Sequence, residues 1–534
     1  MMISQKSRIV KLEIYLFLFK DNITLIIKNY ILIINLVKVI CFMFLRQLCL
    51  SAFILTGLYG CFGDKTNSVA MMTVAQSQKD FSVSNNSQTV LTFAKPKKVI
   101  YVAVNGNNKT GDGTSKKPFL TLNKAFKVAE RNTLIKMGEG NFEVKGMITV
   151  PSHVSLEGVG KKTVITPGKN YQGVLFEAKD FNNEKGDGYQ YFRNFNVDGK
   201  DKSELGFRAW GRENSLFENI TFVNFNNAGI DISGLNNEIS NCRFINASGR
   251  EGQKNEHFSG AIKFMSANGL LIHDNYIEEN SGGGIKSVAS NIRNTQIYNN
   301  TINLKAGKNQ KPNKSASIEI WDLKEGNKIY NNNLNGWVSL INQWDKDQEI
   351  PPKGNLLFYK NKLQANPGIT DDMSGLELGI KGAEFYENTF SGFKHRIFWI
   401  EGWGGKKKPT KDIIIHNNQF NNCGNAMNLG PNGNGVENLK FYDNVIQNCN
   451  GVVMGIGGEK KLINISVTDN IFVNSQKAIT LHGQSKQYVN LRIAENKAYA
   501  SKFGLDNKVD GLNVSGTNPV SLKKGLPATK GFKN

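Results

Sequence analysis

Charged side chains recur in the middle of short apolar segments, where they could transfer protons on an acidic sugar. Examples are Ile262-Lys263-Phe264 and Ile318-Glu319-Ile320. Side chains alternate between the two faces of a strand, so the middle residue should face solvent while its neighbours face a core. The residues expected in this outward column are Arg208, Asp231, Lys263, Lys286, Glu319, Ser339, Glu377, Trp399, Asn428, Val453 and Thr480.

Two lysines of this column suggest β-elimination. If Lys263 and Lys286 occupy adjacent strands, they lie about 5 Å apart. Two ammonium groups at this distance repel each other and lower each other's pKa, so one lysine could act as a neutral base. The other, with Arg208 or Arg396, would hold the carboxylate of a uronic acid while the neighbouring C–H loses its proton. His257 and His395 are alternative bases.

Hydrolysis is the rival chemistry. Glu319 and Glu377 are two positions apart in the column, hence about 9–10 Å. Inverting glycosidases hold their two carboxylates about 6.5–9.5 Å apart. Glu401, beside Trp399, could replace either partner.

Four insertions would build walls on both sides of this column. Residues 249–258 and 305–315 lie on one side, and 342–353 and 402–411 on the other. Cations and aromatic rings along such a groove suit a uronic-acid polymer. The candidate substrate-binding residues are Arg208, Asp231, Trp321, Glu377, His395, Arg396, Trp399, Glu401 and Trp403.

The elements that position these residues are set by a repeated six-residue pattern, as in Ile272-His273-Asp274-Asn275-Tyr276-Ile277. Its fourth residue recurs every 25 to 32 residues as Asn275, Asn300, Asn332, Asn361, Asn388, Asn418, Asn444, Asn470 and Asn496. A repeat of this length predicts a solenoid whose coils depend on their neighbours. We expect the asparagines to adopt the left-handed turn conformation and to hydrogen-bond along the stack.

An aromatic column accompanies the asparagines, two positions before each of them. Its members are His273, Tyr298, Tyr330, Tyr359, Tyr386, His416 and Tyr442. These rings could shield a strand face or form a platform for sugars. A platform would make the protein a non-catalytic adhesin, which is a third hypothesis.

The start of the ordered region carries a recognisable motif. Strand residues 99–103 are followed by Gly111-Asp112-Gly113-Thr114 and Pro118-Phe119-Leu120-Thr121-Leu122, then a short amphipathic helix to about Ala129. This opening resembles the N-terminal cap of right-handed parallel β-helix proteins of the pectin-lyase-like class, which includes lyases, epimerases and glycoside hydrolases. The resemblance implies an all-β chain forming a single right-handed parallel β-helix of roughly a dozen coils, with a short N-terminal helical cap.

The same resemblance bears on the site. Cation pairs on adjacent coils, similar in position to Lys263 and Lys286, occur in alginate and chondroitin lyases of this fold. The acidic cluster that holds calcium in some pectate lyases is missing from the turn at residues 280–284. No cofactor is therefore expected there, although Glu319 and Glu377 could hold calcium elsewhere.

The termini and composition predict export. Residues 43–61 resemble a bacterial lipoprotein signal ending at Cys61, which would be lipidated, and Met43 is expected to be the true start; a plain anchor or secretory signal is the alternative. The expected divisions are 1–61 leader (1–42 a misassigned extension), 62–98 linker, 99–170 N-terminal cap and first coils, 171–498 β-helix, and 499–534 C-terminal cap and tail.

The net charge of +21 predicts attraction to a polyanion. Export to the outer membrane, periplasm or medium argues against nucleic acid and favours an acidic polysaccharide, with membrane contact only through the lipid anchor. A monomer is expected. Cys423 and Cys449 occupy matching repeat positions, and we favour a small apolar ladder over a disulfide between them.

Overall fold

The computed structural model describes residues 91–178, 188–249, 259–279, 282–287, 291–305, 316–341, 356–368, 370–371, 373–402, 410–433, 435–455 and 460–524. All of them belong to the second of two compact units, Val83–Asn534. The predicted leader and most of the linker lie outside the described residues. No helix among the described residues is long and apolar enough to span a membrane.

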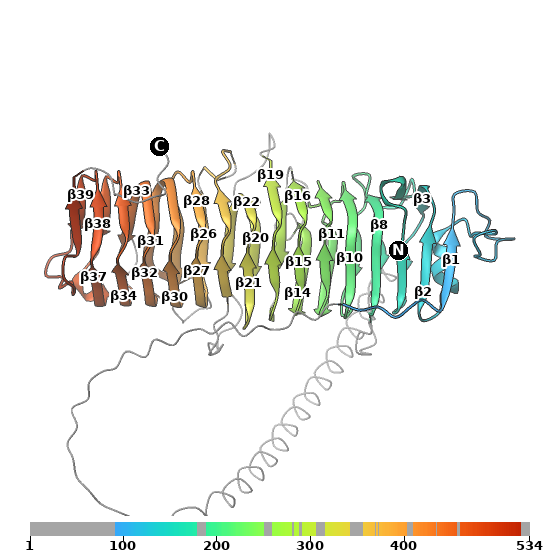
Figure 1. Ribbon diagram of the computed structural model, residues 1–534, viewed down its shortest axis with the longest axis horizontal. Coiled ribbons are helices and arrows are strands. Elements are labelled where there is room, and N and C mark those ends of the chain that lie inside the picture. Colours follow the sequence, from blue (N-terminus) through green and yellow to red (C-terminus); the bar gives the residue numbers. More distant parts are fainter. Residues whose placement is uncertain are drawn as a thin grey trace, which may run out of the picture. The chain divides into compact units, whose positions relative to one another are not determined.

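The described chain winds into a long parallel β-solenoid (Figure 1). Its strands form three faces of 14 or 15 strands each. Each turn contributes one strand to each face, and strands of the same face in successive turns pair in parallel, as β15 does with β18. Face 1 consists of β1 (Lys98–Val102), β2 (Thr133–Met137), β5 (Val154–Glu157), the first halves of β8 (Gln190–Asp198) and β10 (Ser215–Val223), β12 (Glu238–Ser240), β15 (Leu271–His273), β18 (Gln296–Tyr298), β21 (Asn327–Tyr330), β24 (Leu356–Tyr359), β27 (Lys381–Tyr386), β30 (Thr410–His416), β32 (Val436–Tyr442), β34 (Leu462–Thr468) and β37 (Tyr488–Ala494).

Faces 2 and 3 follow in chain order within each turn. Face 2 consists of β3 (Gly140–Val144), β6 (Thr163–Pro167), the second halves of β8 and β10, β13 (Arg243–Ile245), β16 (Tyr276–Glu279), β19 (Thr301–Leu304), β22 (Asn333–Asn335), β25 (Lys362–Gln364), β28 (Thr389–Ser391), the first parts of β31 (Gln419–Gly433) and β33 (Val445–Met454), β35 (Ile471–Val473), β38 (Asn496–Tyr499) and β40 (Val520–Lys523). Face 3 consists of β4 (Ile148–Thr149), β7 (Val174–Glu177), β9 (Leu205–Ala209), β11 (Ala228–Leu235), β14 (Gly260–Asn268), β17 (Gly283–Ser287), β20 (Ala316–Trp321), β23 (Trp337–Ile341), β26 (Ser374–Gly379), β29 (Arg396–Gly402), the later parts of β31 and β33, β36 (Lys477–Leu481) and β39 (Phe503–Asn507).

Three short helices complete the described elements. They are α2 (Leu122–Val128) and the 3-10 turns η1 (Gly160–Lys162) and η4 (Ser485–Gln487). The α2 helix begins where the Thr121 hydroxyl accepts a hydrogen bond from the Lys124 backbone, and it buries Leu122 and Phe126. The sequence therefore predicted this helix correctly, with Ala129 as its C-terminal boundary.

The interior is a stack of aliphatic and phenyl side chains, as the repeat predicted. Ile272, Ile297, Ile329 and Phe358 succeed one another in register on face 1 and are all buried. No single coil could bury such a row, because each residue is covered by its equivalents in the turns before and after. The apolar stacks therefore hold the three faces together along the whole described solenoid.

The repeated asparagines form a continuous buried ladder at the corner between faces 1 and 2. In each turn the asparagine backbone N–H and side-chain Nδ2 both donate to Oδ1 of the next asparagine, as from Asn300 to Asn332 at 3.0 Å for each bond. Nδ2 also donates to a carbonyl of the preceding turn, as from Asn300 to Ile272 O at 2.9 Å. The predicted bonding along the stack is confirmed.

The predicted backbone conformation of these asparagines is wrong. The left-handed residue is the one before each ladder asparagine, for example Asp274 (φ 54°), Asn299 (φ 55°) and Lys360 (φ 55°). The ladder side chain must point inward to reach the next turn, so the preceding residue makes the corner.

Cys423 and Cys449 pair in register, with their Cα atoms 4.7 Å apart, and form a disulfide. The favoured prediction of an unbonded apolar ladder is therefore wrong. Parallel in-register pairing brings equivalent residues of adjacent turns to about 4.8 Å, which lies within the range of a disulfide.

Candidate ion column

The outward column predicted from the sequence is continuous on face 3. The strand register pairs Arg208 with Asp231, Asp231 with Lys263, Lys263 with Lys286, and Lys286 with Glu319. It then runs through Ser339, Glu377, Trp399, Asn428, Val453 and Thr480. The register adds Glu177 before Arg208 and Asp506 after Thr480, neither of which the sequence analysis included. We call the stretch from Glu177 to Trp399 the ion column.

The two lysines lie on adjacent turns as predicted, but each is paired with its own carboxylate. Lys263 Nζ lies 3.5 Å from Asp231 Oδ2, and Lys286 Nζ lies 2.6 Å from Glu319 Oε2. Lys263 also donates to Asn227 Oδ1 at 3.3 Å. The interpretation based on mutual repulsion between two lysines is therefore incomplete, because a carboxylate stabilises each ammonium group.

Burial separates the two lysines. The side chain of Lys263 is 14% exposed and that of Lys286 only 3%. The expectation that every column residue faces solvent is wrong for Lys286. It is also wrong for other buried members of the column, namely Asp231, Ser339, Asn428, Val453 and Thr480. These side chains point away from the core but lie between the side chains of neighbouring turns.

Two glycines explain the position of Lys286. A Cβ built at Gly260 would lie 3.1 Å from Lys286 Cβ, and one at Gly283 would lie 3.1 Å from Lys286 Cε. The lysine stem thus lies across backbone that carries no side chain. Burying an alkyl stem while the ammonium group reaches a carboxylate is a favourable arrangement for lysine. The sequence signal was small residues just before the column position, which the sequence analysis did not use.

The N-terminal end of the ion column carries a second, partly buried charge cluster. Arg208 Nη1 lies 3.2 Å from Glu177 Oε2 and Nη2 lies 3.8 Å from Glu204 Oε1. Its guanidinium also lies 5.0 Å from the Trp210 ring. Asp231, between Arg208 and Lys263, has one buried carboxylate oxygen, Oδ1, with no hydrogen-bond partner. A buried acceptor without a hydrogen-bond partner is costly.

The C-terminal end of the ion column combines an acid, a cation and an indole. Glu377 accepts a hydrogen bond from Ser339 Oγ at 3.2 Å and pairs in register with Trp399. The Arg396 guanidinium lies 4.4 Å from the Trp399 ring centroid, and its Nε donates to Ser374 Oγ at 2.9 Å. Glu319 and Glu377 flank Ser339 in this column, as the hydrolytic interpretation requires.

Other predicted residues are placed only in part. Trp321 lies two residues after Glu319 on β20 and is partly buried, whereas His395 is exposed just before β29. His257, Trp403 and Cys61 lie outside the described residues, as does the Glu401 side chain. Most of the predicted walls fall there too.

No group of three or more His, Cys, Asp or Glu side chains within the described ranges is arranged to hold a metal ion. The turn at 280–284 is only partly described. A cation at Glu319 would have to compete with the ammonium group of Lys286.

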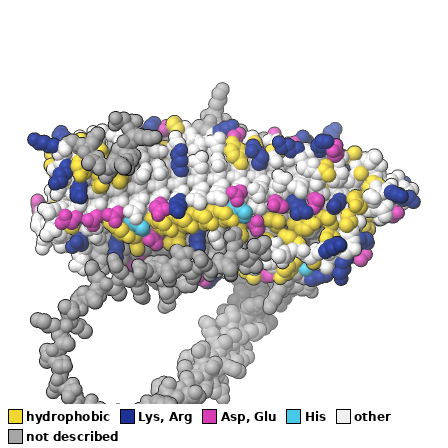
Figure 2. Space-filling view, in the orientation of Figure 1, with side chains coloured by type: hydrophobic (Ala, Val, Ile, Leu, Met, Phe, Trp, Pro, Cys, Tyr) yellow, Lys and Arg dark blue, Asp and Glu magenta, His cyan; other side chains and the backbone are white. Residues whose placement is uncertain are grey.

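The aromatic column on face 1 forms one stacked ladder. Adjacent rings from His273 to Tyr442 lie 4.6 to 5.4 Å apart with interplanar angles of 2° to 12°. Figure 2 shows a hydrophobic band containing histidine atoms along the solenoid, as such a ladder requires. Because neighbouring rings cover each other's faces, mainly ring edges reach solvent. This arrangement favours shielding of the strand over a platform for sugar rings.

The first ring of the ladder should make stability depend on pH. Burial opposes protonation of His273, but its hydrogen bonds to Glu238 (3.2 Å) and Asp274 (2.7 Å) outweigh this and raise its pKa. A raised pKa means that its contribution is fully present below the unfolded value of about 6.5 and is lost as pH rises through the folded value.

We therefore expect a His273→Tyr variant, which keeps the stacked ring, to lose more unfolding free energy relative to the native chain at pH 5.5 than at pH 8.5. Urea denaturation at both pH values measures this. An equal loss at both pH values would show that the charge of His273 does not contribute.

Residues 185–357 match the family described as the right handed beta helix region. Together with the parallel solenoid of the described residues, this match shows that the chain has the right-handed parallel β-helix fold. No curated protein matches it.

Among solved structures, the A-module of the mannuronan C-5 epimerase AlgE6 from Azotobacter vinelandii is 12% identical, with 76% of this chain and 93% of that chain covered and a TM-score of 0.39. Pectate lyase Pel9A is 16% identical, with 56% and 76% covered and a TM-score of 0.38. The tailspike of Escherichia coli bacteriophage HK620, in complex with a pentasaccharide, is 11% identical, with 76% and 79% covered and a TM-score of 0.47.

Proposed function

We propose that this β-helix protein is an exported lyase that cleaves an acidic, uronic-acid-containing polysaccharide by β-elimination at the ion column. The observation that carries the proposal is the unbroken row of ionisable side chains from Glu177 to Glu319 on face 3. Charges in a low-dielectric setting act more strongly than they would in water. The buried oxygen of Asp231 that lacks a partner lies within this row.

The exposures and ion pairs suggest different roles for the two lysines. Lys263 is the more exposed and is held loosely, at 3.5 Å from its partner, so it is the candidate to neutralise the sugar carboxylate together with Arg208. Lys286 is buried and would hold Glu319 in place. Glu319 is then the candidate base, in place of the neutral lysine first considered.

In this scheme the base removes the proton at C5 of the uronate. The electron pair of that C–H bond forms the C4–C5 double bond, and the C4–O glycosidic bond breaks. The leaving oxygen takes a proton from solvent. Neutralising the uronate carboxylate is what makes the C5 proton acidic enough to be removed.

Inverting hydrolysis is the second candidate function. It is favoured by the positions of Glu319 and Glu377, which lie on either side of Ser339 in the same outward column. One carboxyl group would protonate the leaving oxygen, and the other would activate a water molecule. A non-catalytic adhesin is the third alternative.

Export, lipidation of Cys61 and a monomeric state remain part of the proposal, as does a capping role for α2. The helix covers interior residues of the first turns, with Phe126 packed 6.3 Å from Phe176. The ends of a β-solenoid need such cover, because an open end is an exposed strand edge.

The decisive experiment is incubation of the protein with alginate, pectate and glycosaminoglycans. We expect an ultraviolet absorbance from the C4–C5 double bond, and we expect Lys263→Met to lower the rate at least about 100-fold, in the range of a group that acts on the reacting centre. Lys440→Met is the matched control, since Lys440 is exposed on face 1, and it should react at the native rate.

New reducing ends without the absorbance would reject the lyase proposal in favour of hydrolysis, and Glu377→Gln should then abolish activity. Binding of a polysaccharide without any cleavage product would favour the third alternative, a non-catalytic adhesin. A Lys263→Met variant with the native rate would place the active site elsewhere.

A further inference from the structure

From the turn of β2 onward, the corner between face 3 and face 1 uses one backbone conformation in every described turn. The corner residue has a positive φ and is normally Asn, Asp or Gly, the residues that tolerate this conformation best. These corner residues are Asn132, Asn214, Asn236, Gly269, Asn294, Gly326, Gly382, Asp412, Asn438, Asn464 and Asn490.

Two consecutive turns break this rule. His153 (φ 58°) precedes β5 and Tyr189 (φ 40°) precedes β8, so two bulky rings occupy corners that favour small polar residues. Histidine tolerates a left-handed conformation better than most residues, but a tyrosine there is strained, and strained positions cluster at functional sites. Elsewhere in this corner column, side-chain amides bond along the stack, as from Asn490 to Asn464 Oδ1 at 2.9 Å.

The two rings stack on each other instead. Their centroids lie 5.5 Å apart at an interplanar angle of 14°. Tyr189 is 49% exposed, which is unusual for an aromatic residue that is also strained. Shielding of the core therefore does not explain why a tyrosine stands at this corner.

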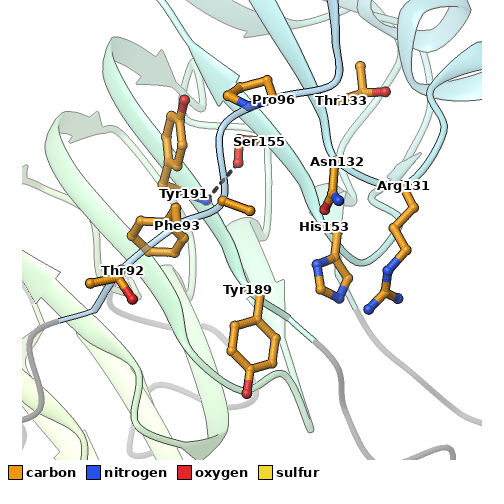
Figure 3. A pocket seen from close by; sticks show the side chains of 11 residues that line it. Thr92, Phe93, Pro96, Arg131, Asn132, Thr133, His153, Ser155, Tyr189 and Tyr191 are labelled. Carbon is orange, nitrogen blue, oxygen red and sulfur yellow. Dashed lines mark hydrogen bonds between the residues drawn. The ribbon is translucent and has the colours of Figure 1, made fainter.

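Both rings line a cavity of about 280 Å³ at the N-terminal end of face 1 (Figure 3). The opposite wall comes from the segment that enters β1, where Phe93 packs edge-on against Tyr191 with centroids 5.4 Å apart. Arg131, an exposed cation, stands beside His153 at the rim. None of the lining residues belongs to the ion column, which lies on face 3.

We propose that this pocket binds a single sugar residue that carries a carboxylate, as a site separate from the ion column. Rings on two sides offer apolar surface to the C–H groups of a pyranose. The planar guanidinium group of Arg131 suits a carboxylate, and His153 adds a second donor. The volume falls just below the usual range of about 300–1,000 Å³ for small-molecule pockets, so it holds one residue and not a chain.

The acidic nature of the ligand rests on the proposed function, whereas the existence of the pocket does not. A site of this kind would hold one end or branch of the polymer while the rest reaches face 3. Its effect would be on binding of substrate, and not on the elimination step.

Isothermal titration of the full chain with galacturonate and mannuronate trisaccharides tests the proposal, with cellotriose as the neutral probe. We expect Tyr189→Asn and His153→Asn each to weaken binding of the acidic trisaccharides at least 10-fold. Both variants restore the residue found at this corner in other turns, so their melting temperatures should equal or exceed that of the native chain. Asn490→Gly, in the same corner column at the far end, is the matched control and should bind as the native chain does.

A Tyr189→Asn variant with native affinity would contradict the proposal that the pocket binds the sugar. Equal binding of cellotriose would contradict the proposal that the ligand is acidic. Titration of Lys263→Met separates this inference from the proposed lyase. If Lys263→Met no longer cleaves the polymer but keeps the binding that depends on Tyr189, both the lyase proposal and the pocket are supported. If the native chain cleaves nothing but shows that binding, the lyase proposal fails and the pocket stands.

Discussion

An Asn361→Asp variant is expected to lose about 4 kcal/mol of unfolding free energy, although the change replaces only one NH2 group by oxygen. Asn361 is 2% exposed, and its Nδ2 donates to Ile329 O at 2.9 Å and to Asn388 Oδ1 at 3.2 Å. In the aspartate variant, the oxygen that replaces Nδ2 could not donate, and it would face the oxygens of Ile329 and Asn388 in a buried position. Each unsatisfied buried group costs about 1–3 kcal/mol, and a buried charge costs more.

The control for this variant lies in another amide ladder. Asn464 is exposed, and its Nδ2 donates to Asn438 Oδ1 at 2.8 Å. Asn464→Asp should change the free energy of unfolding by less than about 1 kcal/mol, because water can replace the lost bond. Urea denaturation compares both variants with the native chain. A loss at Asn361 as small as that at Asn464 would mean that the buried ladder is not a main source of stability.

The same ladder shows why so much of the fold could be predicted from the sequence. A residue that bonds only to its equivalent one turn away must recur at every turn, so its period is visible in the sequence. The interior row at Ile272 and the outward residues Lys263 and Lys286 share this period. Strand alternation then fixes which side each faces. Register and column membership could therefore be predicted without knowledge of a single contact.

Contacts within a turn leave no such period, and these the sequence did not reveal. The burial of Lys286 depends on the absence of side chains at Gly260 and Gly283, and its pairing with Glu319 depends on rotamers. The spacing of Cys423 and Cys449 suits an apolar ladder and a disulfide equally well, so sequence alone could not decide between them.

The corner column shows a third kind of limit. His153 and Tyr189 are ordinary residues in the sequence, because neither belongs to the asparagine repeat. They become exceptional only when the register places them where other turns have Asn, Asp or Gly. A residue that differs from its equivalents in other turns is therefore a better pointer to function than the repeated residues are. The charged side chains of the ion column are identified by the same reasoning.

Removing one member of the ion pair between Lys286 and Glu319 should lower the free energy of unfolding more than removing both members. Lys286 is 3% and Glu319 13% exposed, and their charged atoms lie 2.6 Å apart. Lys286→Met would leave the glutamate in a largely buried site without its partner. Breaking a buried pair from one side costs about 3–5 kcal/mol, whereas replacing both members with apolar residues is often neutral.

A double-mutant cycle therefore gives the clearest test of this pair. We expect Lys286→Met to be destabilised by about 3–5 kcal/mol, and the double variant Lys286→Met/Glu319→Leu to recover most of that loss. Lys477→Met is the control on the same face, because Lys477 and its partner Asp506 are 32% and 25% exposed, and it should lose less than about 1 kcal/mol. If Lys286→Met is no worse than Lys477→Met, Lys286 does not serve to hold Glu319. It would then regain its place beside Lys263 as a residue that acts on the substrate.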